Sequence, residues 1–201
     1  MSSSLNSSVA TVLPGRVICI VGMHRSGTSC LTGSLQEAGL FLGDHHTWNP
    51  YNLKGNRENQ KIVDLNDAVL AASGGAWDRP PERVRWSGAH LREAGELLAS
   101  YGAPGIFGFK DPRTLLVLEG WRQGYPALEL LGIFRDPELV ANSLERRSEM
   151  PREAGLALWY RYNRLLYSEY LRNPFPVLCF DDEPEQFQHK LREVLRDMGL
   201  D

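Results

Sequence analysis

The segment Gly22–Ser29, GMHRSGTS, has the glycines and hydroxyls of a phosphate-binding loop. It follows five apolar residues, Val17–Val21, and precedes a stretch with helical character. Glycines let backbone N–H groups turn inward and a helix N-terminus is positive, so the segment predicts a phosphate site. A Walker A loop has lysine after Gly27, where this chain has Thr28, and the cation is Arg25 inside the loop. The loop therefore favours a nucleotide whose phosphates are arranged differently from those of ATP or GTP.

A second candidate anion site begins at Arg135, which ends the strand expected over 128–134. Asp136 and Pro137 follow and are typical of a helix start. Ser143 comes eight residues after Arg135, two turns into that helix, so a guanidinium and a hydroxyl can reach one phosphate. An arginine before a capped helix is often only structural. The segment indicates a phosphate site mainly because the chain also contains the first loop.

Together the two segments resemble the sulfotransferase family that uses 3′-phosphoadenosine 5′-phosphosulfate (PAPS). In that family a strand is followed by a [KR]-S-G-T-[ST] loop, here Arg25–Ser29, which binds the 5′-phosphosulfate. An arginine, a proline and a serine, here Arg135, Pro137 and Ser143, hold the 3′-phosphate. The resemblance implies that the donor is bound by His24, Arg25, Ser26, Gly27, Thr28, Ser29, Arg135 and Ser143.

Further segments look like the small bacterial branch of this family, over about residues 16–183. They are Asn49-Pro50 with Gly55 and Glu58, Trp77-Asp78, Lys110–Arg113 and Leu158–Asn163. Two departures are visible. The Gly-rich C-terminal segment of the cytosolic eukaryotic branch has no counterpart, which leaves open how far the 3′-phosphate site is closed. Phe180-Asp181-Asp182 stands where relatives often have Tyr-Glu, which weakens any role assigned there.

Sulfuryl transfer requires a base for the acceptor hydroxyl and a cation for the charge that develops on the leaving phosphate. Arg25 and Lys110 suit the cationic role. The base is Glu58 in our first interpretation, at the start of a helix expected over about 57–72. A glutamate there often only complements the helix dipole, and His45 or His46 and Asp111 are the alternatives.

The acceptor is expected to contact residues in the polar loops 44–56 and 73–88 and at one strand end: His45, His46, Trp77, Asp111 and Arg113. Trp48 and Trp159 are further candidates, although core packing explains Trp159 better. Asp111 between two cations is equally consistent with a structural ion pair. Arg146 and Arg147 either reach the nucleotide or an anionic acceptor, or form a solvated helix face.

Strands expected over 17–21, 106–109, 128–134 and 177–180 alternate with helices, which predicts a mostly parallel sheet covered on both faces. Ligands of such sheets bind at the carboxyl ends of the strands, where the motifs above lie. The fold class is α/β, a three-layer α/β/α arrangement. The family resemblance implies a fold like that of the P-loop nucleotide hydrolases.

Composition limits the remaining choices. The chain has 201 residues, a net charge of −3 and 18 Arg against 4 Lys, so no global basic field favours nucleic acid. Three well-separated cysteines predict neither a zinc site nor disulfides and fit the reducing cytoplasm. No apolar run is long enough to span a membrane. Residues 1–15 are expected to form a disordered Ser-rich tail, and 16–201 a single domain.

The sequence thus predicts a PAPS-dependent sulfotransferase that acts on a hydroxyl, or an amine, of a carbohydrate or small-molecule acceptor, with no metal required. The product would be 3′,5′-bisphosphoadenosine. The alternatives are a P-loop-type nucleotide kinase that uses ATP and a non-catalytic nucleotide-binding protein. Neither the acceptor nor the oligomeric state can be read from the sequence.

Overall fold

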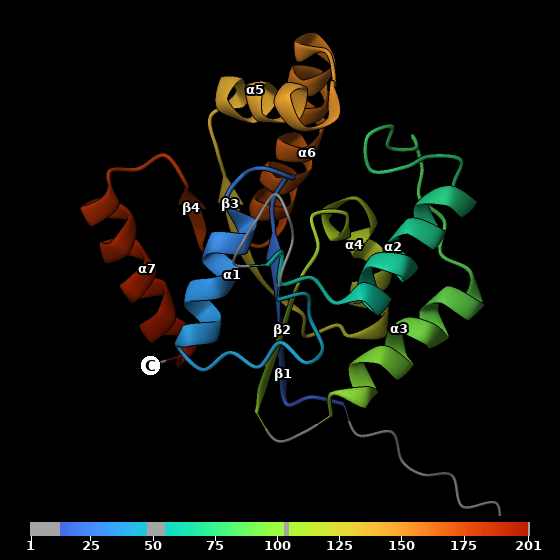
Figure 1. The fold of residues 1–201 in the computed structure, drawn as a ribbon. Helices are drawn as coiled ribbons and strands as arrows, with labels where there is room; N and C mark the ends of the chain where they lie inside the picture. Colours follow the sequence, from blue (N-terminus) through green and yellow to red (C-terminus); the bar gives the residue numbers. More distant parts are fainter. Residues whose placement is uncertain (1–12, 48–54, 103–104, 201) are drawn as a thin grey trace, which may run out of the picture.

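The central element is a parallel sheet of four strands in the order β2-β1-β3-β4 (Figure 1). The structure is a computed structural model that describes residues 13–47, 55–102 and 105–200. The strands are β1 (Arg16–Val21), β2 (Ile106–Lys110), β3 (Glu129–Phe134) and β4 (Val177–Cys179). Each lies where the sequence predicted a strand, and the prediction of a mostly parallel sheet is confirmed.

Helices cover both faces of the sheet and complete the expected three layers. Figure 1 shows α1 and α7 on one side, α2, α3 and α4 on the other, and α5 beside α6 near the ends of the strand arrows. Their bounds are α1 Thr28–Glu37, α2 Gln60–Ala72, α3 Gly88–Ser100, α4 Thr114–Gly124, α5 Pro137–Ser148, α6 Arg152–Arg172 and α7 Pro184–Met198.

Strand β1 is buried on both faces because its side chains alternate between two apolar clusters. Ile18 and Ile20 pack toward α1 and α7 in one cluster. Val17, Cys19 and Val21 belong to the other cluster, with α2, α3, α4 and α6. All five residues are fully buried, which explains why the strand is a continuous apolar run rather than an alternating one.

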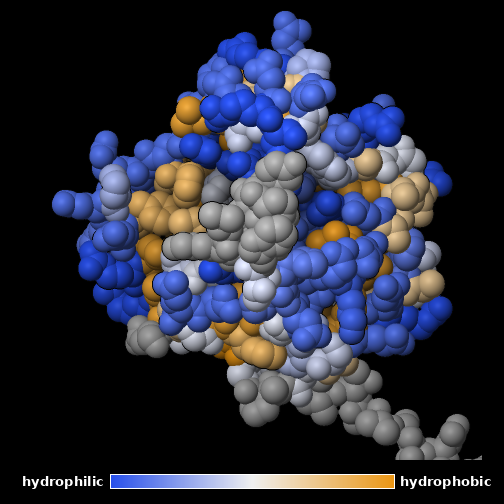
Figure 2. Space-filling model, in the orientation of Figure 1, coloured by the Kyte–Doolittle hydropathy of each residue, from blue (hydrophilic) through white to orange (hydrophobic). Residues whose placement is uncertain are grey.

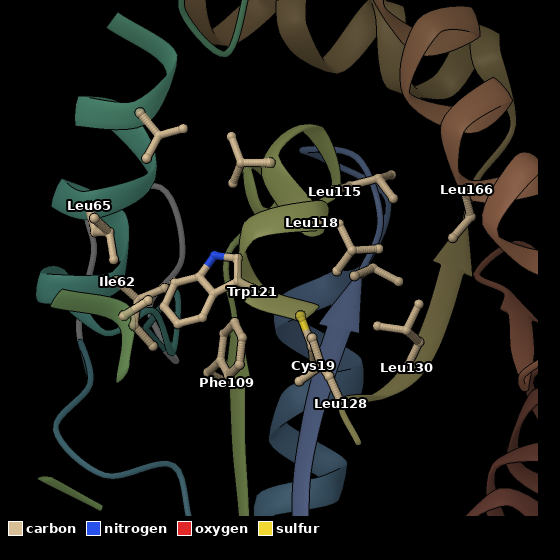
Figure 3. Packing of buried hydrophobic residues seen from close by; sticks show 14 of the residues in the cluster. Cys19, Ile62, Leu65, Phe109, Leu115, Leu118, Trp121, Leu128, Leu130 and Leu166 are labelled. Atoms are coloured by element: carbon tan, nitrogen blue, oxygen red, sulfur yellow. The ribbon is translucent and has the colours of Figure 1, made fainter. Parts of the chain in front are cut away.

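Trp121 of α4 is the largest side chain in the second of these clusters. Figure 3 shows its indole close to Phe109, with Ile62 and Leu65 of α2 on one side and Leu118 on the other. The ring centroids of Phe109 and Trp121 are 5.0 Å apart. Burial of aromatic surface here fastens α2 and α4 to the sheet just below the strand ends.

A buried polar network passes through this cluster. The Trp121 Nε1–H donates to Asn66 Oδ1 at 2.8 Å. The Asn66 amide in turn donates to Asp111 Oδ2 at 2.8 Å and to Thr114 Oγ1 at 2.9 Å. Asn66 thus connects α2, α4 and the residue that follows β2, and its amide satisfies partners that are all shielded from water.

Helix α2 begins later than expected, which leaves Glu58 outside the helix, in the segment that precedes it. Helix α2 begins at Gln60 because Asn59 caps it, so Glu58 lies before the cap and not in the first turn. Glu58 therefore lies outside the first turn of α2, where the alternative of a helix-dipole role had placed it. Helix α4 begins at Thr114, and just before it Asp111 Oδ1 accepts the Arg113 backbone N–H at 3.3 Å.

Hydrophilic residues dominate the face of the molecule shown in Figure 2, with apolar residues visible in smaller patches among them. Within the residues that the structure describes, no helix combines the length and apolarity needed to cross a bilayer.

Replacing Asn66 by alanine is expected to lower the free energy of unfolding by about 2–4 kcal/mol. The change leaves the Trp121 N–H and an Asp111 oxygen without their partner, and a buried group left unsatisfied costs about 1–3 kcal/mol. Urea denaturation measures the loss. Lys61→Ala, an exposed change on the same helix, is the control and should stay within about 0.5 kcal/mol. A loss below about 1 kcal/mol for Asn66→Ala would contradict a structural role for the network.

Candidate active site

A cleft of about 550 Å³ opens at the carboxyl edge of the sheet. Its walls come from the β1–α1 loop, the segment before α2, the ends of β2 and β3, helix α5 and the residue after β4. Most of the residues predicted from sequence line it, namely His24, Arg25, Gly27, Thr28, Ser29, Glu58, Trp77, Lys110, Arg113 and Arg135.

The β1–α1 loop has the features of an anion-binding turn. Gly27 is the N-cap of α1 with φ 86°, and no side chain caps the helix, so its first N–H groups remain available to a ligand. The Phe180 ring packs against Gly27 so closely that a Cβ there would lie 2.2 Å from a ring carbon. The buried Ser26 hydroxyl has no partner among the described residues. A phosphate oxygen would satisfy this hydroxyl.

Arg25 joins the two motifs that lie more than a hundred residues apart in the sequence. Its Nε–H donates to Ser143 Oγ of α5 at 2.8 Å, and its backbone is left-handed with φ 67°. The Arg135 guanidinium approaches the Arg25 carbonyl oxygen at 3.5 Å. Burial lowers the pKa of Arg25, and the neighbouring charges of Arg147 and Arg135 lower it further. This crowding of cations is relieved when an anion enters between them.

Arg135 is held in place by Asp181, Phe180 and Trp159, of which sequence analysis named only Trp159 as a site candidate. Its Nε–H donates to Asp181 Oδ1 at 3.1 Å, and Asp181 Oδ2 accepts the Asp136 backbone N–H at 2.7 Å. Its guanidinium carbon lies 5.2 Å from the centre of the Phe180 ring. The Trp159 indole N–H donates to the Arg135 carbonyl at 2.8 Å. Phe180 and Asp181, where the chain departs from the family pattern, therefore orient this arginine.

Glu58 and Lys110 form an ion pair in the cleft. Lys110 Nζ lies 2.7 Å from Glu58 Oε1 and 3.3 Å from Ser29 Oγ at the end of the loop. The Lys110 side chain is 1% exposed and that of Glu58 is 15% exposed. Burial lowers the pKa of Lys110, and the charge of Glu58 opposes that effect. The pair links the phosphate loop to the wall formed by the segment before α2.

Asp111 does not line the cleft. It is fully buried, and it accepts hydrogen bonds from Asn66 and from Arg113 Nη1, the latter at 2.8 Å. Burial raises the pKa of the Asp111 carboxyl, and the charge of Arg113 opposes the rise. Arg113 itself reaches the cleft, while its Nε lies 2.7 Å from Asp67 Oδ1 without hydrogen-bond alignment. Of the two interpretations of Asp111, the structure favours the ion pair.

The two histidines of the 44–56 loop also lie outside the lining of the cleft. His45 Nδ1 is 2.8 Å from the Gly43 carbonyl oxygen, and His46 Nε2 is 2.7 Å from Gln60 Oε1. Trp77 does line the cleft, with its ring 4.5 Å from that of His24. Trp48 and Asn49-Pro50, named from the sequence, lie outside the described residues.

His24 lines the cleft with a largely buried imidazole. Its Nε2 is buried and has no hydrogen-bond partner among the described residues. Burial lowers the pKa of His24 well below its ordinary value, and the charges of Arg113 and Lys110 act in the same direction. Neutral imidazole nitrogen can donate or accept a hydrogen bond to a ligand without adding charge.

The cleft is strongly cationic although the chain is not. Among the described residues that line it there are six cationic side chains and one carboxylate, Glu58, whereas the whole chain has a net charge of −3. Arg147 lines the cleft and Arg146 does not. Sequence analysis missed Arg57, although its position next to Glu58 was a usable signal. The described residues contain no group of three or more His, Cys, Asp or Glu placed to hold a metal ion.

Comparison with solved structures finds this architecture in two enzymes. A sulfotransferase, STF1 from Mycobacterium tuberculosis H37Rv, aligns with a TM-score of 0.53 at 15% identity, over 94% of this chain and 69% of that chain. The chain has a P-loop-type α/β fold. A gluconokinase from Sinorhizobium meliloti 1021 aligns with a TM-score of 0.51 at 15% identity, over 92% of this chain and 94% of that chain. No protein-family model and no curated protein matches the sequence.

The depressed pKa of His24 predicts a loss of stability in acid. Below about pH 6.5, the ordinary pKa of histidine, His24 binds a proton more readily in the unfolded chain than in the folded one. The free energy of unfolding therefore decreases as the pH falls. If folded His24 stays unprotonated down to pH 5.5, this histidine alone removes about 1.4 kcal/mol of stability between pH 7.5 and pH 5.5. The measurement is urea denaturation of the wild type and of His24→Gln at both pH values.

The difference in unfolding free energy between wild type and His24→Gln should shift by that amount between the two pH values. The exposed change Gln188→Ala on α7, which removes no titratable group, serves as the control and should show no such shift. An unchanged difference for His24→Gln would mean that folded His24 accepts a proton freely.

Proposed function

We propose that this protein is a PAPS-dependent sulfotransferase that transfers a sulfuryl group to a hydroxyl, or an amine, of a carbohydrate or small-molecule acceptor. The hydrogen bond between Arg25 and Ser143 supports this most directly, because it joins the two sequence segments that resemble the two phosphate sites of that family. Those segments, far apart in sequence, share one cationic cleft.

The described residues fit a donor with two separate phosphate groups. The 5′-phosphosulfate would be held by the uncapped N-terminus of α1 and the partnerless Ser26 hydroxyl. The 3′-phosphate would be held by Arg135 and Ser143, with Arg25 between the two positions. Both assignments place negative charge where cationic side chains crowd one another.

The bound donor supplies the sulfuryl group, and the chemistry of the chain lies in charge and proton handling. Arg25 and Lys110 stabilise negative charge at the loop end of the cleft. Glu58 accepts the proton of the acceptor hydroxyl, for which it has a carboxylate that is partly exposed to the cleft. Lys110 holds one Glu58 oxygen at 2.7 Å and so orients the carboxylate. Trp77 and Arg113 complete the acceptor wall, and no step requires a metal.

An ATP-dependent kinase is the rival function. The described site lacks the lysine of the Walker loop, since Thr28 occupies its position. Asp111, the acidic residue nearest a strand end, is buried and already engaged by Asn66 and Arg113, so it offers no oxygen to a magnesium ion in the cleft. Turnover of ATP that depends on magnesium would favour the kinase.

Calorimetry with 3′,5′-bisphosphoadenosine and with AMP tests the proposal. The bisphosphate should bind much more tightly, because AMP lacks the 3′-phosphate that Arg135 and Ser143 would hold. Equal affinities for the two nucleotides would overturn it. A protein that binds the bisphosphate but transfers nothing from PAPS to a broad acceptor panel would be a non-catalytic nucleotide-binding protein.

Arg135→Ala should weaken binding of the bisphosphate about ten- to a hundredfold, the scale of one charge-assisted contact of roughly 1.5–3 kcal/mol. Binding of AMP should change little, since Arg135 would touch only the 3′-phosphate. The same titrations measure both, and AMP serves as the internal control. If both ligands weaken equally, Arg135 supports the fold and does not bind the phosphate.

Glu58→Gln should reduce transfer from PAPS by roughly 10²–10⁴-fold, the usual effect of removing a general base. The amide keeps an oxygen for Lys110 but does not take up a proton, and bisphosphate affinity should barely move. Initial rates at saturating donor measure the effect. Near-normal turnover in Glu58→Gln, with loss of activity in His45→Ala, His46→Ala or Asp111→Asn, would place the base elsewhere.

The proposed setting is the cytoplasm, with residues 16–201 acting as one domain. The proposal rests on the number and spacing of the three cysteines in the sequence, Cys19, Cys30 and Cys179.

A further inference from the structure

Arg57 is a cationic side chain of the cleft that the donor site does not use. It lines the cleft directly beside Glu58, on the segment that precedes α2. The phosphate loop reaches this segment through Ser29, whose hydroxyl donates to the Asn56 carbonyl at 3.2 Å. Arg57 therefore stands on the acceptor side of the proposed transfer site, next to the proposed base.

The backbone at Arg57 is strained. Its φ is 54°, in the left-handed region that non-glycine residues rarely adopt. Two backbone hydrogen bonds hold this conformation: the Arg57 N–H donates to the His46 carbonyl at 3.0 Å, and the His46 N–H donates to the Glu58 carbonyl at 2.9 Å. A strained residue that its surroundings hold in place is characteristic of functional sites.

The guanidinium of Arg57 packs against helix α1. Its Nε–H donates to Gln36 Oε1 of α1 at 3.1 Å. A Cβ on Gly33 would lie 2.9 Å from its Cζ and 3.1 Å from Nη2, so the guanidinium packs closely against this glycine of α1. This arrangement fixes the direction of the fork while the terminal amino groups remain available to a ligand.

The Arg57 side chain has no acidic partner among the described residues, where Gln36 is the one acceptor of its hydrogen bonds. The other cations on this side are neutralised, Lys110 by Glu58 and Arg113 by Asp111 and Asp67. The sequence has no Asp or Glu between Asp44 and Glu58. A partly buried guanidinium with only a neutral partner favours an oxyanion, which its planar fork binds with two hydrogen bonds.

From these observations we infer that Arg57 is the anion-recognition residue of the acceptor site, and that the acceptor carries a carboxylate, sulfate or phosphate group near the hydroxyl that is sulfated. The identification of the bound anion as part of a sulfuryl acceptor rests on the proposed function. The inference that Arg57 binds an anion rests only on its own position and contacts and does not depend on that function. Arg57 selects the substrate, and the adjacent Glu58 handles its proton.

Inorganic sulfate is the probe that tests this site. Calorimetric titrations at constant ionic strength are made on protein saturated with 3′,5′-bisphosphoadenosine and on free protein. Saturated wild type should bind sulfate, and Arg57→Gln should bind it at least tenfold more weakly. Arg192→Gln, which removes an exposed arginine of α7 outside the cleft, is the matched control and should bind like wild type.

Arg57→Gly is a second variant that separates recognition from folding. Glycine adopts the left-handed backbone without cost, so this variant should melt no lower than Arg57→Gln while binding sulfate as weakly. Equal sulfate binding by wild type and both variants would overturn the inference, since the anion would then occupy another position in the cleft. Parallel loss of bisphosphate affinity in the variants would also overturn it, by placing Arg57 in the donor site.

The proposed function fails separately. If wild type does not bind the bisphosphate, but sulfate binding to free protein still depends on Arg57, the donor assignment is wrong and the Arg57 anion site stands. If neither ligand shows dependence on Arg57, the residue has no recognition role.

Discussion

The cleft at the carboxyl edge of the sheet brings several positive charges close together, and the rest of the site must hold them there against their mutual repulsion. Arg25, Arg135 and Arg147 converge there from the loop after β1, the end of β3 and helix α5. Burial lowers the pKa of Arg25, and the charges of Arg147 and Arg135 lower it further. Like charges held close together in a partly buried site repel more strongly than they would in water. The surrounding structure must hold these groups together before a ligand arrives, and an anionic ligand then releases that cost as binding energy.

Uncharged side chains hold two of the arginines in place. Ser143 fixes Arg25 without cancelling its charge, and Gln36 does the same for Arg57. Carboxylates are used where direction matters as well: Asp181 orients Arg135 while capping the Asp136 backbone N–H, and Glu58 pairs with Lys110. The cleft therefore keeps a large excess of positive charge in a chain that is acidic overall. Such a pattern suits ligands with several anionic groups at fixed separations.

Much of this arrangement follows from local sequence. The apolar run of β1 with its glycine loop, and Asp136-Pro137 at the start of α5, produce their elements through short-range effects, so strand ends and the two anion motifs were predictable. Residues that act through distant contacts were not. Arg57 depends on a positive φ and on Gly33 of another element, and Phe180 and Asp181 on packing across the sheet. Asp111 follows a strand and was a candidate base and acceptor contact, but the Asn66 network buries it.

A crystal structure with 3′,5′-bisphosphoadenosine bound tests the central claim most directly. The account predicts the 5′-phosphate at the N-terminus of α1, near the Ser26 hydroxyl, and the 3′-phosphate on Arg135 and Ser143, with Glu58 and Arg57 facing the open part of the cleft. A nucleotide bound with its 3′-phosphate in solvent, or outside the cleft altogether, would contradict it.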